Sequence, residues 1–400
     1  MKKNILISIY DMEIGGMERS LINMLEIFNY DDYNVDLFIL HHKGEFLSLI
    51  PKEVNILPEI GPYTVFRKSI RQSIKEGHLY SSLVRLVSKG VANIKAKKEK
   101  LEEGPGYIQM QLATKYSLYG MPKFKKIYDF AISYAWPHDV LAQKVVAIKK
   151  IAWIHTDFSK LEIDNKLDLN IWKRFDYIAS VSDETTKSFL TKYPSLKNKL
   201  ILIENITSPE FIKSMSEESI EFKNKKEETF NILSVGRLSY VKGFDMAVRA
   251  LKQLHDNGFT DIKWYVVGYG GYEGELKKLI NENNLTESFF LLGKKTNPYP
   301  YIKACDLYVQ PSRYEGKAVT VTEAKILGKP IIITNYPSSK SQIENGKDGI
   351  ICDLTVEGLA KNIEVLYKDF DQRICLSKNC QRNNYNNQNE LEKLYEIING

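Results

Sequence analysis

The second half of the sequence alternates short apolar segments with amphipathic ones, and this alternation constrains the fold more than any other feature. Apolar runs rich in strand formers predict strands, and apolar residues spaced by three and four predict helices. The expected strands cover residues 230–235, 262–267, 289–292, 306–310 and 329–334, and the expected helices cover residues 244–255, 274–283 and 319–327. Because strands joined through helices pair in parallel, this half predicts a doubly wound α/β sheet.

The first half predicts another sheet of the same kind. Its expected strands cover residues 3–8, 35–40, 54–57, 128–134, 150–154, 175–181 and 199–203, with a helix over residues 20–28. Residues 205–226 are polar, charged and without clear periodicity, so we expect the linker between two domains there. A chain of 400 residues is long enough to bury two separate cores.

The composition indicates a soluble globular protein, with 43% hydrophobic and 26% charged residues. There is no run of about 18 apolar residues, so we expect no segment that spans a bilayer. The apolar run near the N-terminus is short and is interrupted by Asp11 and Glu13, which favours a strand over a signal peptide. The 4 cysteines show no metal-binding spacing and are expected to be free thiols. We therefore expect a cytosolic protein.

A basic, helical insertion interrupts the first domain at about residues 62–126. It contains 14 Lys and Arg against 4 Glu, a net charge of +10, and its apolar residues Leu79, Leu83, Leu86, Val87, Val91 and Ile94 have helical spacing. Aromatic residues are interspersed, and the mixture suits an anionic bilayer surface or a lipid-linked diphosphate acceptor. A solvated helical insertion is the alternative. Nucleic-acid binding is disfavoured, because the rest of the chain is net acidic and contains no binding motif.

Two carboxylates mark a candidate site in the second half. Glu315 falls in the loop after the expected strand at 306–310, and Glu323 lies about two turns into the next helix. Both can border a crevice at the carboxyl end of that strand, where ligands bind in open α/β sheets. The spacing alone is weak evidence, since 50 acidic residues produce such pairs by chance.

Cations and helix amides accompany these carboxylates. Arg237 and Lys242 follow the first strand of the second half, and together they could neutralise a departing diphosphate. The alternative is that both are solvated surface charges. The amides of Val319, Thr320 and Val321 begin the next helix and could point at a phosphate.

Together these motifs resemble the donor-binding signature of retaining GT-B glycosyltransferases of family 4, the glycosyl transferases group 1, of the bacterial surface-polysaccharide type. The resemblance is carried by the Ser-x-x-Glu-Gly turn at Ser312, the second Glu, the Gly-Lys-Pro that ends at Pro330, and two glycine-containing blocks at 234–243 and 266–270. A weaker match at the N-terminus makes it nearly chain-long. It implies two Rossmann-like domains facing each other across a cleft. Residues 1–210 would bind the acceptor and residues 211–374 the nucleotide sugar, while a helix over 375–400 would return to the first domain.

The resemblance also implies roles for single residues. Glu323 would bind the ribose, Glu315 would lie near the transferred sugar, and His155 would reach that sugar from the first domain. Arg237 and Lys242 would hold the diphosphate. The residues Gly15, Gly16, Gly236, Gly268, Gly270, Lys294, Lys295, Lys317, Val319, Thr320 and Val321 would line the donor site. Lys317 and Ala318 replace a commoner Phe and Gly, which puts the identity of the sugar in doubt.

The expected reaction is transfer of a sugar, with retention, from a nucleotide sugar such as a UDP-sugar to an acceptor hydroxyl of a lipid-linked or polymeric glycan. We expect no cofactor and no catalytic metal, because the Asp-x-Asp at Asp369 suits a solvated helix face. The expected location is the cytosol, with peripheral association at the inner face of the plasma membrane.

Three alternatives remain for this sequence. A nucleotide-sugar epimerase of the same fold would need acidic residues in the first domain, where no clear set is found. A glycosyltransferase-like subunit without turnover would have no physical need for all the candidate site residues. The glycines at 268–274 could be a dinucleotide fingerprint, but the next strand ends in Leu292-Gly293-Lys294 with no acidic residue for a ribose.

Overall fold

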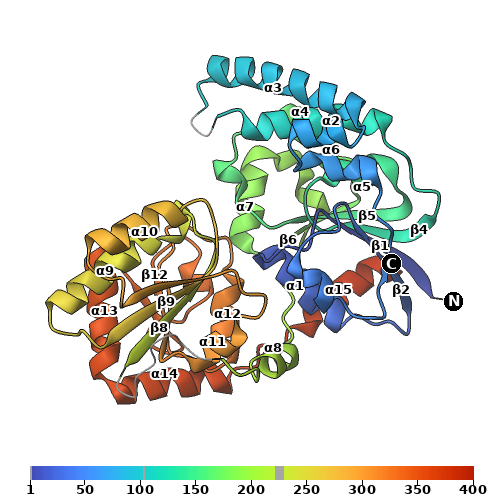
Figure 1. Cartoon of the computed structure of the whole chain (residues 1–400). Coiled ribbons are helices and arrows are strands. Elements are labelled where there is room, and N and C mark those ends of the chain that lie inside the picture. Colours follow the sequence, from blue (N-terminus) through green and yellow to red (C-terminus); the bar gives the residue numbers. More distant parts are fainter. Residues whose placement is uncertain (1, 102–103, 221–228) are drawn as a thin grey trace. The chain divides into compact units, whose positions relative to one another are not determined.

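The computed structural model describes residues 2–101, 104–220 and 229–400, and the chain divides into two compact units (Figure 1). The first unit contains Met1–Glu13, Met17–Ile206 and Gln388–Gly400, and the second contains Thr207–Asn387 with Ile14–Gly16. The sequence places the domain boundaries after residues 210 and 374. In the structure, the chain passes from one unit to the other after Ile206 and again after Asn387. Part of the expected linker, residues 221–226, lies outside the described residues.

The first unit is built on a parallel sheet with the strand order β3-β2-β1-β4-β5-β6-β7. The inner strand β1 pairs in parallel with its neighbours on both sides, with Ile7 opposite Leu37 and Ile132. The strands are β1 Lys3–Ile9, β2 Tyr33–Ile39, β3 Asn55–Ile56, β4 Ile127–Ser133, β5 Val146–Ile154, β6 Tyr177–Ser180 and β7 Leu200–Leu202. Leu6, Ala131, Ala152 and Ile178, on four of these strands, are buried in the core because helices cover the sheet.

Helices complete the first unit. They are α1 Gly16–Glu26, α2 Ile70–Lys75, α3 Leu79–Glu99, α4 Gly106–Ser117, α5 His138–Lys144, α6 Asn165–Trp172, α7 Asp183–Lys192 and α15 Gln388–Asn399. The basic insertion forms α2, α3 and α4, and Gly104 lies between α3 and α4. Over the described ranges, no helix combines the length and the apolar character that crossing a bilayer requires.

The last helix of the first unit is α15, which is shorter than the helix expected over residues 375–400. Its Tyr395 ring stacks on Tyr33 with ring centroids 5.0 Å apart, and Lys3 Nζ donates to the carbonyl oxygen of Ile398 at 3.0 Å. The preceding residues belong to another helix, α14 Phe370–Arg382, whose Leu376 and Cys380 are buried in the second unit. Burial of these two side chains, which the sequence pattern did not reveal, places the boundary after α14.

The second unit has a parallel sheet with the strand order β10-β9-β8-β11-β12-β13. The strands are β8 Phe230–Val235, β9 Ile262–Val267, β10 Phe289–Gly293, β11 Leu307–Gln310, β12 Ile331–Thr334 and β13 Ile350–Cys352. The helices are α8 Pro209–Met215, α9 Phe244–Asp256, α10 Glu273–Glu282, α11 Tyr299–Ala304, α12 Val319–Ile326, α13 Val356–Lys368 and α14. The chain order moves outward from β8 in both directions, so the strand order reverses between β8 and β11. Loops after these two strands therefore meet at a position where α/β sheets bind ligands.

Candidate functional site

The loops that follow β8 and β11 are in direct contact. Gly243 ends the 3-10 turn Tyr240–Lys242 with a φ of +69°, and a Cβ atom at this position would lie 1.8 Å from the carbonyl oxygen of Pro311. Only glycine fits here, because both the backbone conformation and the close approach exclude a side chain. This approach brings Lys242 of one loop to Glu315 of the other.

Lys242 and Glu315 form an ion pair at the carboxyl end of the sheet. The ammonium nitrogen of Lys242 lies 2.6 Å and 2.8 Å from the two carboxylate oxygens of Glu315. The Glu315 side chain is 9% exposed and that of Lys242 is 24% exposed, so the cation lies nearer to solvent than the carboxylate. A ligand that approaches from solvent would therefore meet the ammonium group first.

Buried polar side chains also form hydrogen bonds to Glu315. The Ser312 hydroxyl donates to Oε1 at 2.6 Å, and the Gln310 amide nitrogen donates to the same oxygen at 3.1 Å. The Gln310 side chain is fully buried, and its amide oxygen accepts from the Tyr308 hydroxyl at 2.8 Å. The Ser338 hydroxyl donates to the Glu315 carbonyl oxygen at 2.8 Å. These contacts fix the orientation of the carboxylate without involving solvent.

A second ion pair joins the loop after β11 to the start of α9. Arg313 makes two parallel hydrogen bonds to the Asp245 carboxylate, each of 2.7 Å, and its guanidinium lies 3.8 Å from the Tyr240 ring centroid. Its hydrogen bonds to Asp245 raise the pKa of Arg313 above its usual value. This planar, bidentate geometry holds the loop of Lys242 against the loop of Glu315.

Glu323 lies on α12 with its side chain fully buried. Its Oε1 accepts a hydrogen bond from the Tyr299 hydroxyl of α11 at 3.0 Å. The structure therefore covers the carboxylate that was predicted to bind a ribose, and a ribose could reach it only if the covering groups moved. The expected helix start is present at Val319, but the Val321 amide already donates to the carbonyl oxygen of Ala318 at 3.0 Å.

The other predicted cations lie around this end of the sheet in different settings. Arg237 is exposed in the loop after β8, and among the described residues it has no hydrogen-bond or ion-pair partner. Lys317 is partly buried beside the buried Ala318. Lys294 lies 4.7 Å from the Tyr269 ring centroid, and Lys295 lies 5.7 Å from that of Tyr301.

Close packing explains the glycines in the loops after β8 and β9. A Cβ atom at Gly268 would lie 1.8 Å from the Gly236 carbonyl oxygen, and one at Gly270 would lie 2.3 Å from the Leu238 carbonyl oxygen. The two loops also share a hydrogen bond of 2.9 Å from the Leu238 amide to the Tyr269 carbonyl. Contact between the loops is therefore sufficient to explain Gly268 and Gly270, which were predicted to line the donor site.

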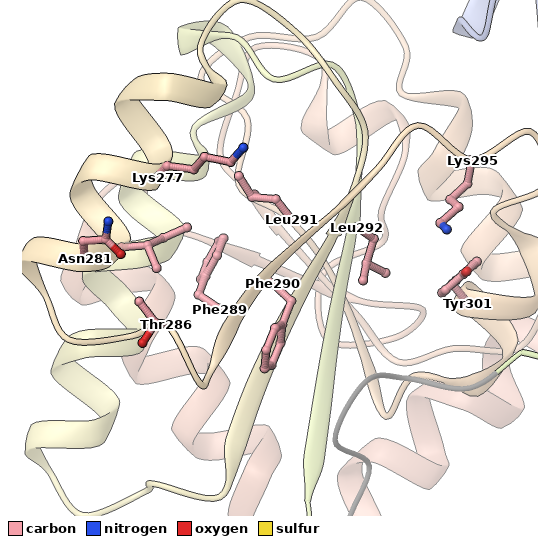
Figure 2. A pocket seen from close by; sticks show the side chains of 10 residues that line it. Lys277, Asn281, Thr286, Phe289, Phe290, Leu291, Leu292, Lys295 and Tyr301 are labelled. Atoms are coloured by element: carbon pink, nitrogen blue, oxygen red, sulfur yellow. The ribbon is translucent and has the colours of Figure 1, made fainter.

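A cavity of about 520 Å³ lies around the edge strand β10, and Figure 2 shows the side chains that line it. The side chains of β10 alternate, so Phe289 and Leu291 lie toward α10 while Leu292 lies toward Tyr301. Lys295 also lines this cavity, whereas Glu315 and Lys242 do not. The full lining consists of Lys277, Ile280, Asn281, Thr286, Phe289, Phe290, Leu291, Leu292, Lys295 and Tyr301.

In the first unit, His155 directly follows β5. Its Nε2 lies 2.9 Å from the Tyr134 carbonyl oxygen. A carbonyl oxygen can only accept, so Nε2 carries the proton of this hydrogen bond. Burial lowers the pKa of His155 to about 4. The imidazole is therefore neutral at pH 7, and its Nδ1 is available as a hydrogen-bond acceptor.

The predicted glycines of the first helix lie at its start. Gly16 is the first residue of α1, and an added Cβ atom would meet no atom within 4 Å. Packing of the described residues therefore does not require glycine at position 16, in contrast to Gly268 and Gly270. Gly15 lies in the bend just before α1.

Sequence reasoning missed the residues that hold the site together. Gln310, Ser312, Arg313 and Asp245 were not assigned roles, although each is in a segment that the prediction used. A glutamine at the end of an otherwise apolar strand was the available signal, because a buried amide needs hydrogen-bond partners.

Comparisons with known proteins agree with this arrangement. Residues 215–387 match the family model of glycosyl transferases group 1. An uncharacterised glycosyltransferase of Methanocaldococcus jannaschii is 29% identical over 174 residues, which cover 43% of each chain. The N-acetylgalactosamine-N,N'-diacetylbacillosaminyl-diphospho-undecaprenol 4-alpha-N-acetylgalactosaminyltransferase of Campylobacter jejuni is 27% identical over 193 residues, 48% of this chain and 50% of that one. The chain thus spans about half the length of the curated relatives it matches.

A solved structure resembles the whole chain. Anabaena HepE in complex with UDP-glucose superposes with a TM-score of 0.69 at 17% identity, covering 98% of this chain and 100% of HepE. The likeness shows the fold: two Rossmann-like units that make up a GT-B protein. The match to the family model of glycosyl transferases group 1 lies within the second unit, Thr207–Asn387.

Proposed function

We propose that this chain is a retaining, metal-independent glycosyltransferase that moves a sugar from a nucleotide sugar to a hydroxyl of a lipid-linked or polymeric glycan. The observation that carries the proposal is the Lys242–Glu315 pair, held by Gln310 and Ser312 inside a glycosyl transferases group 1 domain. A solvent-facing ammonium group beside a rigidly held carboxylate suits a ligand that combines an anionic diphosphate with a hydroxyl-rich sugar.

The chemistry follows from the charges that change during transfer. The bond between the sugar C1 and the diphosphate oxygen breaks, and a bond from the acceptor oxygen to C1 forms on the same face. The proton of the acceptor hydroxyl passes to the departing phosphate oxygen. Lys242 and the exposed Arg237 would stabilise the negative charge that grows on the diphosphate, which is a role that a metal ion fills in other enzymes.

The remaining predicted residues have separate tasks. The amides of Val319 and Thr320 would bind phosphate oxygens at the start of α12. The neutral His155 would accept a hydrogen bond from a sugar hydroxyl through Nδ1. Lys317 would add a cation near the sugar. Among the described residues, no three His, Cys, Asp or Glu side chains gather closely enough to hold a metal ion.

The names of similar proteins support the substrate classes. HepE was crystallised with UDP-glucose, and the Campylobacter jejuni relative is named for a diphospho-undecaprenol acceptor. We therefore propose a UDP-sugar as the donor and a polyprenyl-diphosphate-linked glycan as the acceptor, in the synthesis of a surface polysaccharide.

A donor panel tests this function. The full chain is incubated with UDP-, GDP- and ADP-sugars, and released nucleoside diphosphate is measured with and without a polyprenyl-diphosphate-linked glycan. We expect slow donor hydrolysis for one nucleotide class, faster release with acceptor, and a product with the donor's anomeric configuration by proton NMR. Arg237→Ala should lower the release rate by about two or more orders of magnitude, whereas Lys278→Ala, on the exposed face of α10, should not. Conversion of the donor sugar without diphosphate release would indicate an epimerase, and no turnover of any donor would indicate a non-catalytic subunit.

A further inference from the structure

The helix α3 of the basic insertion has its large apolar side chains on the outside. Figure 1 shows α3 lying along α4. The exposed side chains form one face of the helix, with Leu79 66% and Ile94 71% exposed. We define the α3 outer face as Leu79, Leu83, Leu86, Val87, Val91 and Ile94, all of which are exposed. An apolar strip of this extent on a water-facing helix marks an interaction surface.

The inner face of α3 consists of small residues. The buried residues of α3 are Ser81, Ser82, Ser88, Ala92 and Ala96, and the helix packs on α2 and α4. This is the reverse of an ordinary surface helix, which turns its large apolar residues toward the core. The inner face of α3 therefore buries little apolar area. Packing within this chain does not explain why α3 carries large apolar residues at helical spacing.

Specific contacts fix the rotation of α3. Arg85 donates to the Ser73 hydroxyl at 3.1 Å and to the Lys68 carbonyl oxygen at 2.5 Å. Farther along the helix, Lys95 pairs with Asp164, the N-cap of α6. Gln111 of α4 binds the Asp164 amide with its side-chain oxygen at 2.8 Å. These anchors on the flank of α3 hold the outer face toward solvent.

The ends of the outer face carry residues typical of a membrane interface. Tyr80 donates from its hydroxyl to the Tyr116 carbonyl oxygen at 3.1 Å, and the nearby Tyr116 and Tyr119 are 42% and 72% exposed. At the other end of the helix, Lys97 and Lys98 are exposed. Tyrosine rings and lysine ammonium groups around an apolar helix face match the headgroup layer of a bilayer.

The net charge of the insertion indicates which partner binds the α3 outer face. Residues 62–126 carry a net charge of +10, while the rest of the chain has 42 basic and 46 acidic residues. A second copy docking through the same face would bring two strongly basic regions together, which is unfavourable. An anionic lipid surface complements both the charge and the apolar strip.

We propose that α3 lies in the interface of an anionic bilayer, with the α3 outer face among the acyl chains and the flanking basic residues at the headgroups. A helix of 21 residues would lie along the surface for about 30 Å. The inference rests on the proposed function in one respect: a lipid-linked acceptor lies in a bilayer, which gives the enzyme a reason to bind there. Vesicle binding itself needs no turnover, so it can fail or succeed independently of the transferase reaction.

The test is co-sedimentation of the full chain with vesicles of phosphatidylcholine alone or mixed with phosphatidylglycerol. The double variant Leu83→Ser and Ile94→Ser removes apolar area from residues that are already exposed, so its fold should be unchanged. We expect wild type to bind the anionic vesicles at low salt and to be released at high salt. The double variant should bind at least about tenfold more weakly. The control Ile148→Ser changes an exposed residue of β5, 72% exposed, and should bind like wild type.

Three outcomes would overturn the proposal. Wild type could stay in the supernatant with both vesicle types, or the double variant could bind as tightly as wild type. The third outcome is that wild type sediments as a dimer and the double variant as a monomer. This result would show that a second copy of the chain covers the α3 outer face. Donor hydrolysis without vesicles should be equal in wild type and the double variant, so an inactive enzyme that binds vesicles would contradict the proposed function alone.

Discussion

The ammonium nitrogen of Lys242 lies 2.6 Å and 2.8 Å from the two carboxylate oxygens of Glu315. Two residues that were predicted to contact different parts of one ligand are therefore bound to each other. Ser312 and Gln310 also donate to Glu315, so the carboxylate keeps two donors when the ammonium group turns toward a diphosphate. This arrangement lowers the cost of separating a partly buried ion pair.

Arg237→Ala and Lys242→Ala should each lower the rate of nucleoside diphosphate release by about two or more orders of magnitude. Each variant removes positive charge that stabilises the departing diphosphate. Lys242→Ala also leaves Glu315 without its cation. The measurement is kcat and KM for the donor found in the panel. Near-wild-type kcat in both variants would show that these cations do not meet the diphosphate.

The buried Gln310 should act as a positioning residue for Glu315. Gln310→Met should lose about tenfold in kcat, because Glu315 then lacks one hydrogen-bond donor, and about 1–3 kcal/mol of stability, because the buried Tyr308 hydroxyl then lacks the Gln310 acceptor. Gln310→Glu places a second carboxylate next to Glu315, and like charges raise the pKa of the pair. The acid limb of its kcat profile should therefore move to higher pH. An unchanged profile in Gln310→Glu, together with a full kcat in Gln310→Met, would limit Gln310 to a structural role.

Much of the second unit could be predicted from the sequence because its signals are local. The strand β9 is a nearly continuous apolar run and the helix α9 has a strong helical periodicity, and Gly243 lies between the expected strand at 230–235 and the expected helix at 244–255. The contact of Ser338 with Glu315 could not be predicted, since β12, which precedes Ser338, pairs with β11 only in the folded sheet.

Other features depended on burial, which a single sequence shows only indirectly. The apolar spacing of Leu83 and Ile94 identified a helix but did not indicate that this face would point outward. Cys380 is fully buried in the second unit and assigns α14 to it, although the sequence offered no signal for that assignment. Long-range packing decided both cases.

Gly243→Ala should destabilise the second unit by about 2 kcal/mol or more. The new Cβ atom would lie 1.8 Å from the Pro311 carbonyl oxygen, and the φ of +69° is itself unfavourable for alanine. Gly271→Ala is the matched control, since its Cβ atom would meet no atom within 4 Å. Thermal melting and hydrogen exchange of the β8 and β11 amides measure the effect. Equal melting of both variants would contradict the close approach of the two loops.

Addition of EDTA should leave the transfer rate largely unchanged, because Arg237 and Lys242 supply the positive charge. The rate is measured before and after chelation, and again after Mg²⁺ or Mn²⁺ is added back. Lys242→Ala provides the comparison: added metal should not restore its rate. A complete loss with EDTA that metal reverses would contradict the metal-independent mechanism.

The first unit should lose stability as the pH falls below about 6.5, and His138 should contribute to this loss. Burial lowers the pKa of His138 to about 3, with a smaller effect from His155. In the unfolded chain the imidazole takes up a proton below about 6.5, whereas the native side chain stays neutral down to about 3. The unfolded state thus binds more protons in this window, so the stability contributed by neutral His138 is present above pH 6.5 and decreases toward pH 3.

The variant His138→Asn isolates this contribution, because asparagine does not titrate and keeps a polar atom near the Ser133 hydroxyl, 2.8 Å from Nδ1 in the native protein. Between pH 6.5 and 4.5, wild type should lose stability relative to the variant by an amount approaching about 1.4 kcal/mol per pH unit. The neighbouring Asp139, whose pKa burial and Asp168 raise to about 7, acts in the opposite direction but is present in both proteins. Urea unfolding followed by the fluorescence of Trp172, whose ring centroid lies 4.8 Å from that of His138, provides the measurement. Parallel pH dependence in the two proteins would show that His138 is protonated in the native state.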